Sequence, residues 1–423
     1  MSSLRDRLRE VIKPVASGLS PTAPTSDVRP KPDATDSLDV LGGEWRGRSF
    51  VVERYMPPSS RCGRATIGDL AARLEASAHE APLVCGGVPA RPPFVFFDLE
   101  TTGLSGGAGT QAFLVGIGWF AADGGFTTRQ HLLARLGDEH AMLNAVAEDL
   151  GRAGALVSFN GKSFDAPVLE TRYLFHRLDW IASEHPHIDV LHSARRFWKE
   201  DECSLAVLEQ QVLGAWREDD VAGFEIPSRY FQFLRSGDAR HLADVLEHNR
   251  RDLLSLAGLT SRLLEIIAGG PDFAENSREA LALGQVYARG RDMHRAIGAF
   301  ERAISLGAKK TGRRAAELRA DALRSLALSY RRMRRYDEAA RCWIALIESG
   351  CAEHVEREAI EALAIHHEHR ARDLTSARAF AEENVTRASD RVAREKVFRA
   401  AQQRLARIER KISEAGRLGE LLG

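Results

Sequence analysis

Residues 94–104 of the chain read FVFFDLETTGL, an apolar run that ends in two carboxylates and a turn. The four apolar residues at its start predict a buried strand. Residues i and i+2 of a strand point to the same face, so Asp98 and Glu100 are expected to project together from the strand end. Paired carboxylate oxygens are ligands that a divalent cation such as Mg²⁺ prefers. The alternative is an acidic strand end that faces solvent.

Further strands and helices are predicted around this run. Residues 123–125, DGG, are a hairpin signal between two strands. Antiparallel strands followed by helices that alternate with a strand indicate a mixed α/β sheet covered by helices. The predicted strands are residues 94–99, 111–120, 127–134 and 155–159, and the predicted helices are residues 139–150, 163–178, 204–213 and 239–267.

Length and charge suggest more than one domain. The chain has 423 residues, enough for two or three domains, and no net charge, so bulk charge identifies no partner. Residues 277–423, however, hold 30 Lys and Arg against 21 Asp and Glu, a net charge of +9. The remaining residues, 1–276, carry the compensating −9. An acidic part that holds the carboxylate motif is therefore joined to a basic part.

The N-terminal part gives few signals. Residues 14–39 are rich in Pro, Ser, Thr and Asp, so residues 1–44 are predicted to form a disordered tether. Residues 45–92 are treated as a lead-in without an assigned role, with a strand at 49–52. The five cysteines form no CxxC pair, and no signal peptide or apolar membrane span is apparent. We expect reduced thiols, a cytoplasmic location and no membrane contact.

After the breaker GGP at residues 269–271 the strand signals end. Residues 277–423 are predicted to form a helical repeat domain of the tetratricopeptide type, because two copies share a Tyr-to-Ala spacing of nine and an Ala-to-aromatic spacing of four. A plain helical bundle is the alternative. Either form offers a surface for a protein partner. Basic clusters at 309–314 and 331–335 are either a solvated face or a phosphate-binding patch. The matched residues are Tyr287, Ala296 and Phe300 in one copy and Tyr330, Ala339 and Trp343 in the other.

Two more acidic motifs follow the first. Residues 158–165, SFNGKSFD, end a strand and place Asp165 at the start of a helix, where it is either a helix cap or a site residue. Residues 248–252, HNRRD, place His248 and Asp252 one helical turn apart on one face. A carboxylate there can hold a metal while the imidazole accepts a proton. The alternative is an exposed His–Asp pair.

The order D-x-E, N-x4-D and H-x3-D resembles the DEDD superfamily of 3′–5′ exonucleases. Within it the chain is similar to the YprB-like ribonuclease-H-like family, over about residues 93–268 and more loosely in the tail. One departure is the last motif. In DEDD exonucleases it usually has Tyr separated from the Asp by three residues, or His separated from it by four, whereas in this chain three residues separate His248 from Asp252.

The resemblance implies an enzyme that degrades single-stranded DNA or RNA from the 3′ end to nucleoside 5′-monophosphates. Two Mg²⁺ or Mn²⁺ ions would activate water and stabilise the leaving oxygen, and His248 would accept the water proton. An alternative is a helical-repeat scaffold that carries a catalytically idle nuclease fold. The residues that would hold the ions are Asp98, Glu100, Asp165 and Asp252, and those that would contact substrate are Thr101, Leu104 and Asn160.

Overall fold

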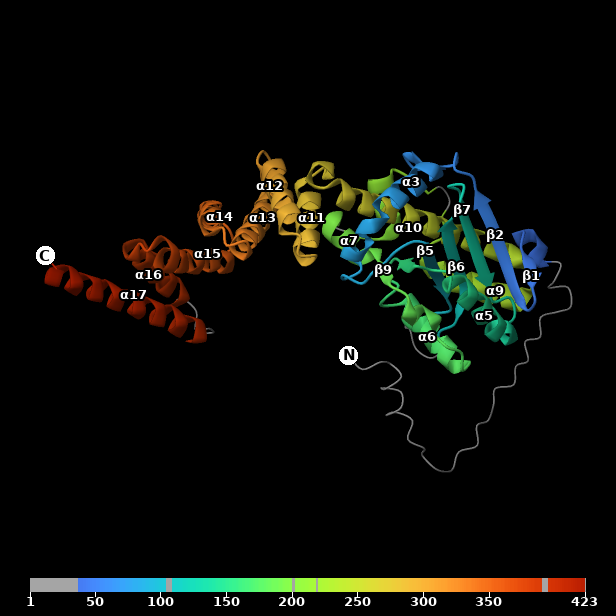
Figure 1. Cartoon of the computed structure of the whole chain (residues 1–423). Coiled ribbons are helices and arrows are strands. Elements are labelled where there is room, and N and C mark those ends of the chain that lie inside the picture. Colours follow the sequence, from blue (N-terminus) through green and yellow to red (C-terminus); the bar gives the residue numbers. More distant parts are fainter. Residues whose placement is uncertain (1–36, 104–108, 200–201, 218–219, 390–394, 423) are drawn as a thin grey trace, which may run out of the picture.

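The structure is a computed structural model that describes residues 37–103, 109–199, 202–217, 220–389 and 395–422. A sheet-containing part is followed by an all-helical part that extends away from the sheet towards the C-terminus (Figure 1). No helix among these described residues is long and apolar enough to cross a membrane.

The carboxylate-bearing run forms β5 (Phe94–Thr101), an inner strand of a seven-stranded sheet. β5 pairs antiparallel with β6 and parallel with β8, so the predicted mixed sheet is confirmed. The hairpin between β6 and β7 turns at Gly124, whose φ of +83° favours glycine. In spatial order the strands are β1 (Glu44–Arg46), β2 (Ser49–Met56), β7 (Phe126–Leu132), β6 (Ala112–Phe120), β5, β8 (Ala155–Ser158) and β9 (His187–Asp189).

Residues 45–56, within the segment treated as a lead-in without an assigned role, are part of this sheet. β2 pairs antiparallel with β7 along its whole length, and β1 adds the edge strand. Most of the predicted tether, residues 1–36, lies outside the described residues. Its last residues are packed, because Leu38 and Leu41 are buried and the Ser37 hydroxyl accepts a hydrogen bond from the Ala239 backbone at 2.6 Å. Packed residues thus occur before residue 45, within the segment predicted to be a tether.

Helices cover both faces of the sheet because the side chains of β5 alternate between two cores. Phe94 and Phe96 pack with α3 and α10, whereas Val95 and Phe97 pack with α5, α6 and α9. The helices of this part are α3 (Ile67–Ser77), α4 (Ala81–Val84), α5 (Glu139–Leu150), α6 (Asp165–Phe175), α7 (Val190–Phe197), α8 (Leu205–Leu208), α9 (Ile226–Ser236) and α10 (Ala243–Gly269). The two-residue strands β3 (Arg61–Cys62) and β4 (Ala65–Thr66) pair outside the main sheet.

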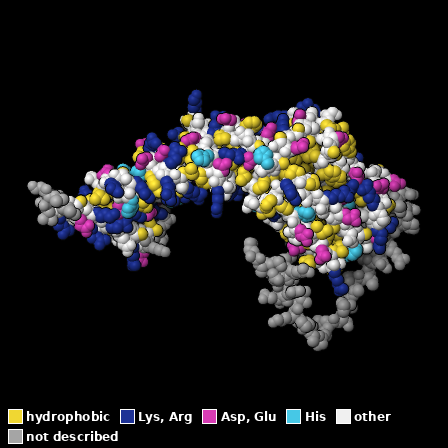
Figure 2. Space-filling view, viewed as in Figure 1, with side chains coloured by type: hydrophobic (Ala, Val, Ile, Leu, Met, Phe, Trp, Pro, Cys, Tyr) yellow, Lys and Arg dark blue, Asp and Glu magenta, His cyan; other side chains and the backbone are white. Residues whose placement is uncertain are grey.

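The C-terminal part is all-helical, as predicted, with successive helices packed on one another. Each aromatic residue of the two repeat copies is buried. Lys and Arg side chains are spread along its visible surface, with Asp and Glu among them (Figure 2). The helices are α11 (Ser277–Arg289), α12 (Met293–Gly307), α13 (Arg313–Arg332), α14 (Tyr336–Glu348), α15 (Glu353–His366), α16 (Leu374–Ser389) and α17 (Glu395–Leu422).

No gap in the core separates the two parts at residues 269–276. One continuous cluster of buried side chains runs from β5 and α10 into α11 and α13. The Trp198 indole donates a hydrogen bond to Glu279 at 3.1 Å, and the Tyr287 hydroxyl donates to the Ile267 carbonyl. α11 also packs on α7, as Figure 1 shows. The first helix of the tail is therefore bonded and packed against the sheet-containing part.

A buried ion pair fixes α5 against α6, the helix that starts at Asp165. Glu139 accepts two hydrogen bonds from Arg172, at 2.6 and 2.5 Å, and lies 2.9 Å from His176 Nε2. Burial raises the pKa of Glu139, but the hydrogen bonds from Arg172 and His176 outweigh it and leave this pKa below its ordinary value. Folding therefore favours the ionised form of Glu139.

We expect Glu139→Gln to lower the free energy of unfolding by about 3–5 kcal/mol at pH 7, because it leaves the buried Arg172 without its charged partner. The pKa of Glu139 is lower in the folded state, so its contribution is present above the unfolded pKa and is lost as pH falls through the folded value. The difference from wild type is thus expected to shrink in acid. Urea unfolding between pH 3 and 7 measures it, with the exposed Glu148→Gln on the same helix as control. A constant difference down to pH 3 contradicts the assignment.

Candidate active site

β5 projects Asp98 and Glu100 towards α10. Both continue the face of Phe94 and Phe96, and both are half-buried. Opposite Asp98 on β6 stands Gly116, and any Cβ there would collide with the Asn249 side chain. The missing side chain lets the Asn249 amide approach and donate a hydrogen bond to Asp98 Oδ2 at 2.8 Å. Asn249 lies inside the predicted HNRRD motif, but sequence reasoning gave it no role.

Asp165 is buried at the first turn of α6 and is brought to the site by the loop after β8. Asp189, at the end of β9, fixes that loop. Its carboxylate accepts hydrogen bonds from the backbone amides of Asn160 at 2.9 Å and Lys162 at 3.2 Å, and from Leu191 at 3.1 Å at the start of α7. The Asp189 carboxylate therefore holds the loop and caps a helix.

α10 presents His248 and Asp252 on one face, as the spacing predicts. His248 Nε2 lies 3.6 Å from Asp252 Oδ2, and His248 Nδ1 lies 2.7 Å from Asp220 Oδ1. Burial raises the pKa of Asp220, but hydrogen bonds from His248 and Arg217 outweigh it and keep this pKa below its ordinary value. A carboxylate can only accept a hydrogen bond, so Asp220 orients the His248 ring by accepting from Nδ1–H.

Arg217 lies among carboxylates of the site, and the sequence analysis did not identify it. Its guanidinium pairs with Asp252 at 2.5 Å, with Glu209 at 2.7 Å and with Asp220 at 3.0 Å. Glu209 also accepts a hydrogen bond from the Ser255 hydroxyl at 2.7 Å. Arg217 follows the π-helical turn Glu209–Leu213 in a segment without periodicity or motif, so no sequence signal marked it.

The four predicted carboxylates influence one another electrostatically. Burial raises the pKa of Asp98 well above its ordinary value, and the charges of Asp252 and Glu100 raise it further. Burial and the charges of Asp252 and Asp165 act in the same way on the pKa of Glu100. For Asp165, burial and the charge of Asp189 raise the pKa to about 7. The structure therefore gathers these side chains into one region of excess negative charge.

This donor set fits a divalent cation in its chemistry, because every donor is a carboxylate oxygen. Arg217 neutralises Asp252, whereas the charges of Asp98 and Glu100 still oppose each other. Among the described residues Glu100 makes no hydrogen bond or ion pair, so its oxygens remain available. The side chains are not yet arranged as ligands: within the described part of the chain, no three acidic, His or Cys side chains form a group that could hold a metal. Asn249 and Arg217 instead engage Asp98 and Asp252.

The predicted substrate contacts are placed less clearly. Thr101 is buried and donates its hydroxyl to the Gly103 carbonyl at 2.9 Å, so this hydroxyl stabilises the turn after β5. Asn160 is exposed next to Asp165, with a φ of +66°. Leu104 belongs to residues 104–108, which lie outside the described part of the chain.

The comparison with known families agrees with this fold. A model of the RNase H superfamily matches residues 95–264, which span β5 to α10. Proteins of this class are nucleic-acid-cleaving hydrolases that typically use divalent metal ions. The match contains all four carboxylates and His248.

A more specific relative extends beyond that match. The chain is 33% identical over 322 residues to the uncharacterized protein YprB of Bacillus subtilis (strain 168), and the alignment covers 75% of each chain. The chain therefore belongs to the YprB family, and its residues 95–264 form a domain of the RNase H superfamily.

Proposed function

We propose that the protein is a divalent-metal-dependent 3′–5′ exonuclease that hydrolyses single-stranded DNA or RNA to nucleoside 5′-monophosphates. The observation that carries the proposal is the grouping of the Asp98, Glu100, Asp165 and Asp252 carboxylates, where burial and neighbouring carboxylates raise the pKa of the first three, next to the His248 imidazole. The order of these residues along the chain matches the DEDD exonucleases and supports the direction of cleavage.

The cofactor that suits this chemistry is a pair of Mg²⁺ or Mn²⁺ ions. Asp98, Glu100, Asp165 and Asp252 would hold them, and the ions would supply Lewis-acid activation of water and stabilisation of the leaving 3′ oxygen. Arg217 competes with such ions for Asp252, since it already neutralises that carboxylate. We therefore expect metal binding to weaken the Arg217–Asp252 pair.

His248 is the proposed general base. Its Nε2 faces Asp252 and accepts the proton of the attacking water, while Asp220 holds Nδ1–H and stabilises the imidazolium that forms. Asp220 is thus a positioning residue. Asp220, which lies outside α10, orients the imidazole. The His248 ring can therefore face Asp252 even with the His-x3-Asp spacing.

A second reading is a helical-repeat scaffold with an idle nuclease fold. It is favoured by the hydrogen bonds that Asn249 and Arg217 make to Asp98 and Asp252, since these occupy two proposed ligands. A tetratricopeptide-like tail that binds a protein partner fits both readings. The tetratricopeptide type of the tail and a cytoplasmic location stay predictions.

An end-label assay tests the proposed function. Single-stranded DNA and RNA labelled at the 5′ end, incubated with purified protein and Mn²⁺ or Mg²⁺, are expected to shorten stepwise, whereas a 3′ label is expected to appear at once as a mononucleotide. Chelation of the metal by EDTA is expected to stop both. Internal cuts without stepwise shortening would contradict the exonuclease, and intact strands in all conditions would favour the scaffold.

A further inference from the structure

Basic side chains without an acidic partner lie between the candidate site and the first tail helices. Within the described part of the chain none of them forms an ion pair, although their neighbours do: Arg295 pairs with Glu80 at 2.7 Å and Arg335 with Glu338 at 2.9 Å. The unpaired residues are Lys162 in the loop after β8, Arg196 on α7, Arg289 at the end of α11, Arg291 after it, and Arg332 at the end of α13.

Two adjoining hollows contain these five residues. The first, about 410 Å³, lies between α7, the segment after α4 and the end of α11, and is lined by Lys162, Arg196 and Arg289. The second, about 730 Å³, lies between α11, α12 and α13 and is lined by Arg289, Arg291 and Arg332. Arg289 lines both, so the two hollows adjoin at its side chain, and we call their five cations the basic track.

The basic track begins at the candidate active site. Asp189 lines the first hollow, and its charge acts directly on the pKa of Asp165. The Asp189 carboxylate accepts three backbone amide hydrogen bonds and lies 4.0 Å from His192 Nε2, and it forms no ion pair with Lys162 or Arg196. Arg196 and Arg289 come close enough that burial and the Arg196 charge lower the pKa of Arg289. Two guanidinium groups that line one hollow and repel each other favour the binding of an anion between them.

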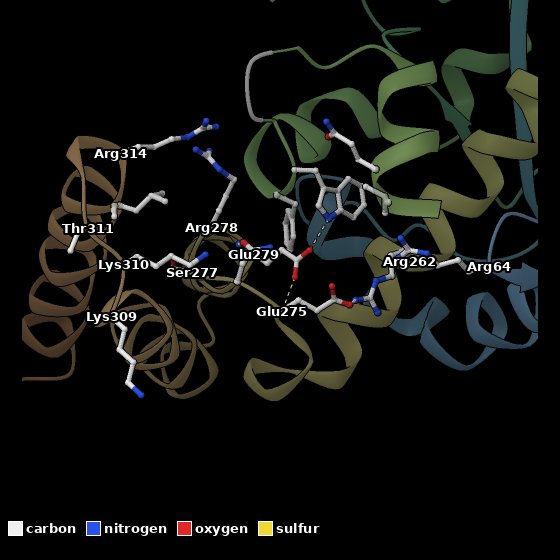
Figure 3. A pocket seen from close by; sticks show the side chains of 17 residues that line it. Arg64, Arg262, Glu275, Ser277, Arg278, Glu279, Lys309, Lys310, Thr311 and Arg314 are labelled. Carbon is white, nitrogen blue, oxygen red and sulfur yellow. Dashed lines mark hydrogen bonds and ion pairs between the residues drawn. The ribbon is translucent and has the colours of Figure 1, made fainter. Parts of the chain in front are cut away.

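A third hollow, at the opposite end of α11, differs in charge. There the cations are mixed with carboxylates: Arg262 pairs with Glu275 at 2.6 Å, and Glu279 lies in the same wall beside Ser277 (Figure 3). Lys309 and Lys310 stand on the far wall of this hollow. It serves as an internal comparison, since it sits at the same junction and is also rich in Lys and Arg.

We propose that the basic track binds the phosphate backbone of single-stranded nucleic acid and leads it from the candidate site onto the helical tail. The proposal rests on the proposed function, because the strand's 3′ end would lie at the carboxylates. Spaced cations that neutralise successive phosphates suit a polyanion, and continuity with the site favours nucleic acid over an acidic protein. The fixed junction of α11 with the sheet-containing part would keep the track aligned with the site.

Oligonucleotide binding by the double variant Arg196→Gln/Arg289→Gln tests the track. The full chain with Asp98→Asn serves as background, so that the probe is not degraded. Fluorescence anisotropy with single-stranded DNA or RNA of about 20 nucleotides, longer than one typical binding site, gives the affinity. Loss of two phosphate contacts is expected to weaken binding about 10- to 30-fold at 0.1 M salt and to reduce the log–log salt slope by about 1.4.

Lys309→Gln/Lys310→Gln is the matched control, because it removes two positive charges at the other end of α11. It is expected to weaken binding no more than about threefold, through long-range charge alone. Equal losses in the two variants, or unchanged binding by the first, would overturn the track. Binding of an acidic protein partner lost in the first variant while oligonucleotide affinity persists would overturn it as well.

Cleavage and oligonucleotide binding, measured separately, distinguish failure of the basic-track proposal from failure of the proposed nuclease function. If wild-type protein cleaves end-labelled strands but Arg196→Gln/Arg289→Gln binds them normally, the track is wrong and the exonuclease stands. If wild-type protein never cleaves but this variant selectively loses oligonucleotide affinity, the track stands and the proposed chemistry falls.

Discussion

Asp98→Asn is expected to abolish metal-dependent hydrolysis while the protein stays folded. The amide has no charge to hold a divalent cation, so a loss of at least about 10³-fold is expected from removal of a ligand central to the site. Stability is not expected to fall, because burial and neighbouring carboxylates raise the pKa of Asp98 and the substitution relieves that repulsion. Mononucleotide release with Mn²⁺ and thermal unfolding in EDTA measure the two effects.

The control for this substitution is Asp272→Asn, which removes an exposed carboxylate beyond α10. It is expected to retain full activity. Undiminished hydrolysis by well-purified Asp98→Asn would show that this carboxylate holds no ion, and a large loss of stability would show that Asp98 has a structural role instead.

His248→Ala is expected to reduce the rate by about 10²–10⁴-fold with little change in metal or oligonucleotide binding, as for loss of a general base. Asp220→Asn is expected to cost less, because His248 remains but the Nδ1–H bond to a carboxylate is lost. Mononucleotide release and oligonucleotide binding, measured on the same preparations, distinguish a base from a structural residue, because only the rate is expected to fall when the base is lost.

His241→Ala, on the turn just before α10, is the matched control for the imidazole and is expected to behave as wild type. If alanine at 248 leaves the neutral-pH rate unchanged, the imidazole does not take the proton, and the geometry with Asp220 has another purpose.

The central strands were predictable because local sequence determines them. The run before Asp98 is apolar on both faces, as an inner strand requires, and α5 has the predicted bounds because its apolar residues follow the helical period. β2 was recognised only as a short strand without a role. Its partner, β7, lies more than 70 residues further along the chain, and such pairing leaves no local signal.

The junction between the sheet-containing part and the helical tail was likewise only partly predictable from local sequence. The GGP breaker correctly marks the end of α10, because Gly270 has a φ of +77° and Pro271 cannot continue the helix. It does not mark the end of the core. Trp198 and Tyr287 pack and bond across the break, and contacts between helices that are distant in sequence depend on tertiary structure rather than on composition.

At the candidate site the sequence predicted the carboxylates but not the groups that hold them. Strand spacing paired Asp98 with Glu100, and helix spacing paired His248 with Asp252. Only the family resemblance joined these motifs and Asp165 into one expected site. Arg217 and Asp220 lie in an irregular segment, where sequence spacing does not predict which way a side chain points. Both become visible only through their ion pairs with Asp252 and His248.

Crystals of the protein soaked in Mn²⁺ provide the most direct test of a metal-dependent active site. Anomalous difference maps are expected to show two peaks about 3.5–4 Å apart among Asp98, Glu100, Asp165 and Asp252. The Arg217 side chain is expected to have withdrawn from Asp252, since the ions replace its charge. Absence of manganese from these carboxylates at saturating concentration, with Arg217 still bound to Asp252, would contradict the enzyme and favour the scaffold.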